Sequence, residues 1–237
     1  MQSRTKPPLR QRGAGGGRGR CPVIILAGGK STRLGRDKAS AVLAGRTLLQ
    51  RAIDATNELA ERYVIVTAKG QQVPAAETSV SVRGVEDVYA ETGPLGGIYS
   101  GLVAIADGAD TPPLRKRGGG RGEGSHALVV ACDMPLLQPA LLRELLRLAP
   151  GHDAVVPTRD GLPEPLCAVY STACIEPARL LLERGVYKVA GILDGVDALL
   201  VPEAQWRPFD PEGLSFLNVN READLEQAKA LIERGEM

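Results

Sequence analysis

Three basic residues, Lys30, Arg33 and Lys38, closely follow the glycine pair Gly28 and Gly29 near the start of the chain. Glycine lets the backbone turn sharply and brings its N–H groups close to a ligand without a Cβ in the way. Exposed N–H groups and fixed cations together suit a polyphosphate, whose negative charge is spread over many oxygens. The segment therefore predicts a site for nucleotide phosphates, although its spacing fits neither a Walker A loop nor the G-x-G-x-x-G pattern.

A second candidate for a role in chemistry is the carboxylate of Asp133. It follows the apolar run 128–132 and stands directly before Met134 and Pro135. A carboxylate held at the mouth of a strand is a suitable ligand for Mg²⁺, which takes hard oxygen donors and keeps several waters. Such a metal bridges phosphate oxygens and offsets their charge during phosphoryl chemistry. The alternative interpretation is a strand-end aspartate that only caps the following helix.

These residues must be positioned by the elements around them. Residues 23–26 and 63–67 read as buried strands, and the amphipathic stretch 47–62 between them predicts a helix, which makes a right-handed βαβ unit. Further strands are expected at 80–85, 127–132, 154–157, 166–170 and 198–201, and further helices at 96–106, 141–148, 173–184 and 221–234. The alternation predicts an α/β fold with a three-layer, doubly wound, mostly parallel sheet, in which ligands bind beyond the carboxyl ends of the strands.

Composition separates a core from two basic segments. Of the 237 residues, 29 are basic and 28 acidic, but residues 1–20 hold six basic residues, five glycines and no acid. This tail is expected to be a flexible extension, and a second Arg/Gly-rich stretch at about 107–126 is expected to be a disordered insertion. Residues 21–237 then form a single domain. Neither segment carries aromatic stacking residues, so nucleic-acid binding is a weaker alternative.

Four cysteines without a C-x-x-C pair predict small buried thiols, with Cys21 near the surface. No signal peptide or membrane-length apolar run is present in the sequence, which predicts a cytoplasmic protein without membrane association.

The first motif supports a family resemblance. Residues 26–38 read Leu-Ala-Gly-Gly-Lys-Ser-Thr-Arg-Leu-Gly-Arg-Asp-Lys and resemble the signature L-A-G-G-x-S-x-R-x-G-x-D-K of nucleotidyltransferases, in particular the molybdenum cofactor guanylyltransferases. The segment around Asp133 resembles the C-D-M-P motif of the same family, whose aspartate holds magnesium. The resemblance implies a nucleotide-binding set made of Leu26, Ala27, Gly28, Gly29, Lys30, Ser31, Arg33, Lys38 and Asp133. Within this set, Arg33, Lys38 and Asp133 are the expected catalytic residues.

Two further segments are expected on the nucleoside side. Residues 86–97 resemble the family block E-D-x(n)-G-P-L-x-G, which implies that Asp87, Gly96 and Gly97 contact the nucleotide. The Asp87 carboxylate could accept bonds from the guanine edge or from ribose hydroxyls, and the sequence leaves both open. Thr67 stands where relatives often carry asparagine, and it offers one hydroxyl in place of an amide's paired donor and acceptor. Base selectivity at this position is therefore open.

The acceptor side is expected at two other segments. Pro165 and Leu166 resemble the family's E-P-L strand, although the apolar residues there also fit a plain core strand. Asn218 and Asn220 resemble an N-x-N ending, in which a strand over 216–219 would send both side chains to the same side. Asn220 is also expected to cap the final helix.

Together the motifs imply a reaction in which GMP passes from GTP to the phosphate of molybdopterin, with Mg²⁺ as cofactor and pyrophosphate as product. Because that phosphate is already ionised at neutral pH, no strong general base is required, and positioning and charge neutralisation supply the catalysis. The alternatives are a cytidylyl- or sugar-phosphate nucleotidyltransferase and a non-catalytic nucleotide- or cofactor-binding accessory protein. The protein is expected to be a monomer that could meet molybdenum-insertion proteins or molybdoenzyme chaperones.

Overall fold

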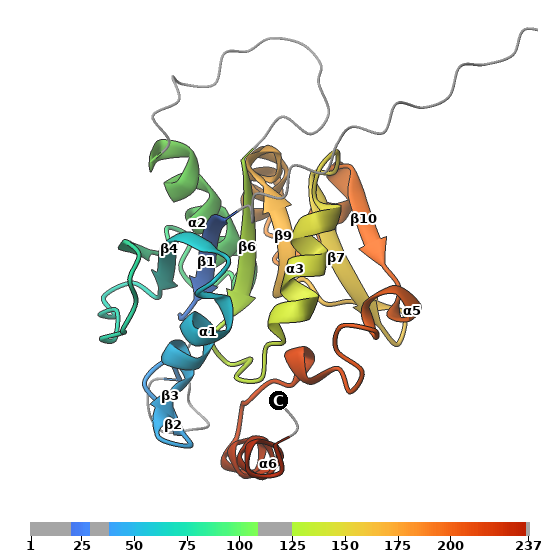
Figure 1. The fold of residues 1–237 in the computed structure, drawn as a ribbon. Helices are drawn as coiled ribbons and strands as arrows, with labels where there is room; N and C mark the ends of the chain where they lie inside the picture. The colour runs from blue at the N-terminus through green and yellow to red at the C-terminus, as the bar shows by residue number, and fades with distance from the viewer. Residues whose placement is uncertain (1–19, 29–37, 109–124, 236–237) are drawn as a thin grey trace, which may run out of the picture.

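The computed structural model describes residues 20–28, 38–108 and 125–235 of the chain. Its main sheet has the strand order β10-β7-β9-β6-β1-β4-β5, with β8 paired to β7, and β2 pairs with β3 apart from it (Figure 1). The strands are β1 (Cys21–Leu26), β2 (Val42–Leu43), β3 (Arg46–Thr47), β4 (Ala60–Thr67), β5 (Val82–Glu86), β6 (His126–Ala131), β7 (Ala154–Arg159), β8 (Leu162–Pro163), β9 (Cys167–Ser171) and β10 (Ala198–Val201). The helices are α1 (Leu48–Thr56), α2 (Pro94–Gly108), α3 (Pro139–Leu148), α4 (Ile175–Glu183), α5 (Glu203–Trp206) and α6 (Glu222–Glu233), with 3-10 turns η1 (Thr172–Cys174), η2 (Val189–Gly195) and η3 (Leu214–Phe216).

Helices cover both faces of the sheet, which confirms the predicted three-layer α/β fold (Figure 1). On β1, Val23 and Ile25 join one apolar cluster and Ile24 joins another. The first cluster contains buried residues of α1 and α3, and the second contains buried residues of α2 and α4. Burial on both faces explains why the strands read as continuous apolar runs rather than as alternating patterns.

The strand order reverses beside β1, and this reversal creates the place where a ligand can bind. The chain runs from β1 outward to β4 and β5, all parallel, and then returns to β6 on the other side of β1. Connections that leave β1 in opposite directions open a crevice at the carboxyl ends of the strands. Within the sheet, β9 is antiparallel to both of its neighbours, so β7 again runs in the direction of β6.

Several predicted boundaries differ from the structure. The helix expected over 47–62 ends at Thr56, where the threonine hydroxyl bonds back to the carbonyl of Ala52 at 2.7 Å, and the chain then enters β4 at Ala60. The β2–β3 hairpin was not predicted, although its turn residues Ala44 and Gly45 both have positive φ (48° and 78°), as two-residue hairpin turns require. Alanine is not a typical residue at a position with positive φ, so Ala44 gave no indication of the turn in the sequence.

The predicted insertion and the predicted strand over 216–219 also need correction. Asp107 and Gly108 belong to α2 and His126 begins β6, so the insertion is shorter than 107–126, and residues 109–124 lie outside the described part of the chain. Residues 1–19 of the tail lie outside it too. In place of the strand, the 3-10 turn η3 ends at Phe216 and an irregular segment follows.

All four cysteines are free, with Cys21 half-buried and the other three buried. No helix within the described ranges is long and apolar enough to cross a membrane.

Candidate functional site

Three of the predicted site residues meet at the carboxyl edge of the sheet. The ammonium nitrogen of Lys38 lies 3.0 Å from Asp133 Oδ2 and 2.5 Å from Asn220 Oδ1. Asp133 follows the end of β6, and Asn220 precedes α6. The three residues come from distant parts of the sequence and gather near the carboxyl end of β6. The structure thus joins the phosphate-loop lysine, the predicted metal ligand and one predicted acceptor-side residue.

Backbone hydrogen bonds fix Asp133 in this place. The N–H of Cys132 donates to the carbonyl of Leu26 at 3.0 Å, which extends the β1–β6 pairing to the residue before Asp133. On the other side, the N–H of Val219 donates to the carbonyl of Asp133 at 2.8 Å, so the segment before α6 is attached directly to the end of β6. Asp133 is therefore held by the main chain from two directions.

The two carboxylate oxygens of Asp133 have different surroundings. Oδ2 is paired with Lys38, and the two side chains are 20% and 22% exposed. Oδ1 is buried and has no hydrogen-bond partner among the described residues. An unpartnered buried carboxylate oxygen is costly unless a cation or donor meets it, so Oδ1 fits the role of a metal ligand. Within the same ranges no group of three His, Cys, Asp or Glu side chains could hold a metal by itself.

The described beginning of the phosphate loop packs closely on the end of β4. The N–H of Ala27 donates to the carbonyl of Val66 at 2.8 Å, and a Cβ added to Gly28 would lie 2.7 Å from the backbone nitrogen of Ala68. Glycine is needed here because the main chains of two strands come together. Leu26 and Thr67 are buried at this edge, each at 8% exposure or less. Gly29, Lys30, Ser31 and Arg33 lie outside the described residues, and their predicted roles stay predictions.

Asp87 lies at the end of β5 and receives bonds from its own chain. Its Oδ1 accepts the backbone N–H of Tyr89 at 3.0 Å and the hydroxyl of Ser100 at 3.2 Å. Burial raises the pKa of this carboxyl group, and the two hydrogen bonds counteract the increase. A Cβ added to Gly96 would lie 2.7 Å from Asp87 Oδ1 and closer still to Thr92 Oγ1, so the space that this glycine leaves is filled by the side chains of Thr92 and Asp87. A Cβ on Gly97 would lie 3.0 Å from Leu26. Packing within the protein therefore gives both positions a structural reason for glycine, and their predicted contact with the nucleotide stays a prediction.

The other acceptor-side residues are connected to the end of β6, to β9 or to η3. The carbonyl of Leu166 accepts the N–H of Ala131 at 3.1 Å, and that of Pro165 accepts the Tyr170 hydroxyl at 2.9 Å. Asn218 Nδ2 donates to the carbonyl of Phe216 at 3.4 Å. Pro165, Leu166 and Asn218 are half-buried, and in the part of the chain that is described no hydrogen bond or ion pair joins any of them to the side chains of the Lys38–Asp133 pair.

Asn220 does not cap α6 as expected. Arg221 is the N-cap residue, and the backbone N–H groups of both Asn220 and Arg221 donate to Asp224 Oδ2 at 2.7 Å. The Asn220 side chain is thereby available to accept from Lys38. An acid three residues after an N-cap is a known capping signal, and Asp224 stands at that position of α6. Ser100, the partner of Asp87, was missed because a serine inside a helix gives no sequence signal.

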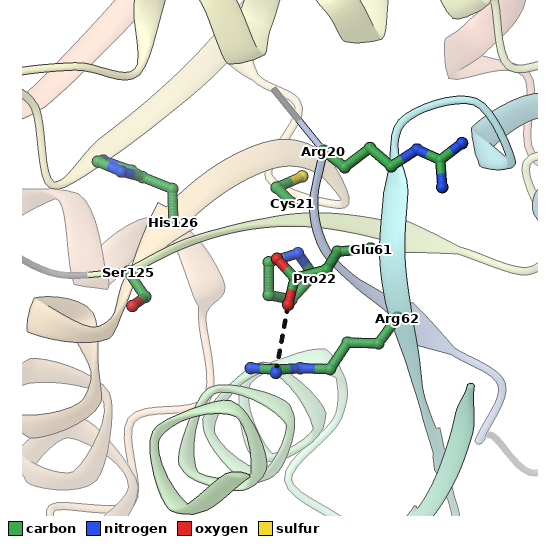
Figure 2. A pocket seen from close by; sticks show the side chains of 7 residues that line it. All are labelled: Arg20, Cys21, Pro22, Glu61, Arg62, Ser125 and His126. Carbon is green, nitrogen blue, oxygen red and sulfur yellow. Dashed lines mark hydrogen bonds and ion pairs between the residues drawn. The ribbon is translucent and has the colours of Figure 1, made fainter. Parts of the chain in front are cut away.

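A cavity of about 460 Å³ lies at the opposite, amino edge of the sheet (Figure 2). It is lined by Arg20, Cys21, Pro22, Glu61, Arg62, Ser125 and His126. Arg62 and Glu61 form an ion pair of 3.4 Å across it. None of the predicted site residues lines this cavity, and doubly wound sheets bind their ligands at the other edge. The Lys38–Asp133–Asn220 group is therefore the better candidate for the active site.

Comparison with known proteins agrees with the sequence motifs. Residues 23–197 match the family described as the MobA-like NTP transferase domain. The molybdenum cofactor guanylyltransferase of Desulfosudis oleivorans is 31% identical over 214 residues, which cover 90% of this chain and 96% of that protein. This match leaves the predicted non-catalytic accessory protein without support.

Solved structures show the same fold. The crystal structure of molybdopterin-guanine dinucleotide biosynthesis protein A from Archaeoglobus fulgidus has a TM-score of 0.69 and 25% identity, and the match covers 90% of this chain and 99% of that one. The 2-C-methyl-D-erythritol 4-phosphate cytidylyltransferase of Thermus thermophilus has a TM-score of 0.59 at 17% identity, covering 89% and 98% of the two chains, and shares the fold alone.

Proposed function

Because the chain belongs to the MobA-like NTP transferase domain family and is a nucleotidyltransferase, we propose that it transfers GMP from GTP to the terminal phosphate of molybdopterin. The acceptor phosphate attacks the α-phosphorus, the bond to the leaving pyrophosphate breaks, and the guanine dinucleotide form of the cofactor results. The observation that carries the proposal is the meeting of Lys38, Asp133 and Asn220 at the strand-order reversal.

The residues of the chain act mainly through charge and position. The ammonium group of Lys38 is a fixed cation beside the crevice, where it can offset charge on the phosphates in the transition state. Since the acceptor phosphate is ionised at neutral pH, none of these residues has to remove a proton. Asn220 and Asp133 hold the lysine in one orientation, and this preorganisation lowers the cost of aligning the reacting groups. Lys30 and Arg33 are proposed to add cations from the phosphate loop.

Asp133 is also proposed to hold a divalent metal, Mg²⁺. The buried Oδ1 atom offers a hard oxygen donor, and Mg²⁺ commonly binds one or two carboxylates together with waters and substrate phosphates, so the lack of a larger acidic cluster among the described residues is compatible with it. When bound, the metal supplies charge neutralisation at phosphate oxygens. The Lys38 pair on Oδ2 keeps the carboxylate from rotating, so that Oδ1 stays directed to one place.

The test is to measure pyrophosphate release and thermal stabilisation with each of GTP, CTP, ATP and UTP, in the presence of Mg²⁺ and molybdopterin. Of the four nucleotides, only GTP is expected to give turnover and thermal stabilisation. Omitting molybdopterin separates transfer from hydrolysis, and EDTA in place of Mg²⁺ separates metal-dependent turnover from binding. A response to no nucleotide would contradict the proposed activity.

The second candidate function uses CTP in place of GTP. The observation that favours this candidate is Thr67, which is 2% exposed at the end of β4 and provides a hydroxyl where relatives often carry an amide. A preference for CTP in the same assay would keep the fold and the site and change the base. The variant Thr67→Asn should then shift the preference toward GTP, whereas Thr56→Asn, in which the residue lies at the end of α1, serves as a control for folding.

A further inference from the structure

Asp224, on the first turn of α6, accepts a hydrogen bond from the backbone of Asn220, a residue of the candidate active site. A single oxygen, Oδ2, accepts the N–H groups of Asn220 and Arg221, both at 2.7 Å. These two bonds lower the pKa of the Asp224 carboxyl group, and the charge of Lys38 adds a smaller effect in the same direction. Asp224 is therefore ionised at neutral pH, and its bonds to the main chain are charge-assisted.

The bonds form a continuous path to the candidate active site. Asp224 fixes the main chain at Asn220, the side chain of Asn220 accepts from Lys38 at 2.5 Å, and Lys38 pairs with Asp133 at 3.0 Å. The neighbouring Val219 is already tied to the carbonyl of Asp133. A change at Asp224 can therefore reach the side chain of the metal-ligand candidate by way of Asn220 and Lys38.

The helix itself does not depend on Asp224 alone. Leu225 and Ala228 of α6 are buried in a cluster with Leu43, Leu48 and Val219. Apolar contacts of this kind hold a helix in place when one capping bond is removed. The loss of Asp224 should thus loosen the turn before α6 while the helix stays docked.

We propose that Asp224 is a positioning residue of the nucleotidyl-transfer site, acting through Asn220 on the orientation of Lys38. This inference rests on the proposed function for its activity readout. Outer-shell residues that orient a catalytic group commonly contribute about 10- to 100-fold to activity. Asp224→Ala should lower kcat about tenfold, at the lower end of that range, because Lys38 keeps its direct pair with Asp133.

A double-mutant cycle with Asn220 separates positioning from plain helix capping. The variants are Asp224→Ala, Asn220→Ala and the double variant, with kcat and the unfolding midpoint measured for each. If Asp224 acts through Asn220, its replacement lowers kcat in the wild-type background and has no further effect in the Asn220→Ala background. The stability loss should appear in both backgrounds. Equal loss of kcat in both backgrounds would overturn the proposal.

Two further variants complete the design. Asp224→Asn keeps an acceptor oxygen and should recover part of the kcat lost in Asp224→Ala. Glu226→Ala removes an exposed acid from the same helix without touching Asn220 and should leave kcat unchanged. Wild-type kcat in Asp224→Ala would reject the positioning role while the proposed function stands.

A measurement that does not need turnover distinguishes failure of the proposed function from failure of the positioning role of Asp224. The ammonium signal of Lys38 in ¹H–¹⁵N spectra should be protected from exchange in the wild type and less protected in both Asn220→Ala and Asp224→Ala. If the wild type turns over no nucleotide but this pattern holds, the proposed function fails and the positioning relation remains. An unchanged Lys38 signal in Asp224→Ala would overturn the positioning relation.

Discussion

Lys38 Nζ lies 3.0 Å from Asp133 Oδ2, although the two residues are 95 positions apart in the sequence. Each side chain is about one-fifth exposed, so the pair is only partly screened by water. The pairing occupies one oxygen of Asp133 and leaves the other, Oδ1, buried without a partner in the described part of the chain. The same contact therefore neutralises the carboxylate in part and holds Oδ1 in a fixed direction, as the proposed metal site requires.

Replacing Asp133 by asparagine should abolish most of the turnover without unfolding the protein. The amide keeps the size of the side chain but removes the charge that a metal requires, and loss of one electrostatic contact of this kind commonly lowers kcat by about 10²- to 10³-fold. Pyrophosphate release with GTP, molybdopterin and Mg²⁺ measures the loss, and thermal unfolding checks the fold. Wild-type turnover in Asp133→Asn would remove this residue from the catalytic machinery.

Replacing Lys38 by methionine should weaken GTP binding. Methionine preserves much of the length and the apolar stem, so the change isolates the charge, and one charge-assisted contact is worth about 1.5–3 kcal/mol, or about 10- to 100-fold in Kd. Calorimetry against GTP gives the affinity. Lys229→Met, at an exposed position of α6, is the matched control. Equal affinities for both variants and the wild type would show that Lys38 does not contact the nucleotide.

Gly96→Ala should destabilise the fold. An added Cβ would lie 2.7 Å from Asp87 Oδ1, and the carboxylate is held by Tyr89 and Ser100, so it cannot move away without losing bonds. Overpacking of this kind costs about 1–3 kcal/mol of the free energy of unfolding. Urea denaturation measures it. Gly108→Ala, on the same helix, places its Cβ 3.6 Å from the flexible Arg83 side chain and should be tolerated; an equal loss in both variants would argue against the clash.

The fold was accessible from the sequence because its signal is local and repeated. Each central strand is buried on both faces, so runs such as 23–26 and 127–132 are apolar throughout and stand out between amphipathic helices. Element ends were less accessible. The end of α1 depends on a hydroxyl of Thr56 bonding back to its own helix, and such side-chain bonds compete with helix geometry without a clear pattern.

The site was predictable where one motif holds the chemistry and unpredictable where distant segments meet. Lys38 and Asp133 could be named separately from their motifs, and the strand order explains why they lie at the same edge of the sheet. Asn220 was placed in the site by resemblance but assigned as a helix cap, because sequence spacing cannot show that Asp224 already satisfies that backbone. Asp87 and Gly96 lie in one sequence segment, 86–97, but their packing depends on how the chain folds back between the end of β5 and the start of α2, which the motif does not show.

The stability of the protein should depend on pH through Asp87. Burial raises the pKa of this group above its ordinary value of 3.8. For an acid with a raised pKa in the folded state, the stabilising contribution is present below 3.8 and is lost as pH rises through the folded-state pKa. Asp87→Asn stays neutral, so its free energy of unfolding relative to the wild type should rise as pH increases above 3.8 and become constant once the folded-state carboxyl group is ionised. Urea denaturation of both proteins across this range tests the sign, and a constant difference would contradict it.

Removal of residues 1–19 should leave nucleotidyl transfer unchanged. Arg20, the first described residue, lines the cavity at the amino edge, whereas Lys38 and Asp133 lie at the carboxyl edge. The strand between the two edges, β1, has 6 residues and spans roughly 20 Å, about twice the Debye length at physiological ionic strength. Screening over that distance removes most of the attraction that Arg20 could exert on GTP. The kcat/KM for GTP should therefore agree between the full chain and the shortened one at physiological salt. A loss of kcat/KM that disappears at high salt would instead show that the basic tail attracts the nucleotide, and a change in RNA binding without a change in kcat/KM would assign the tail a separate role.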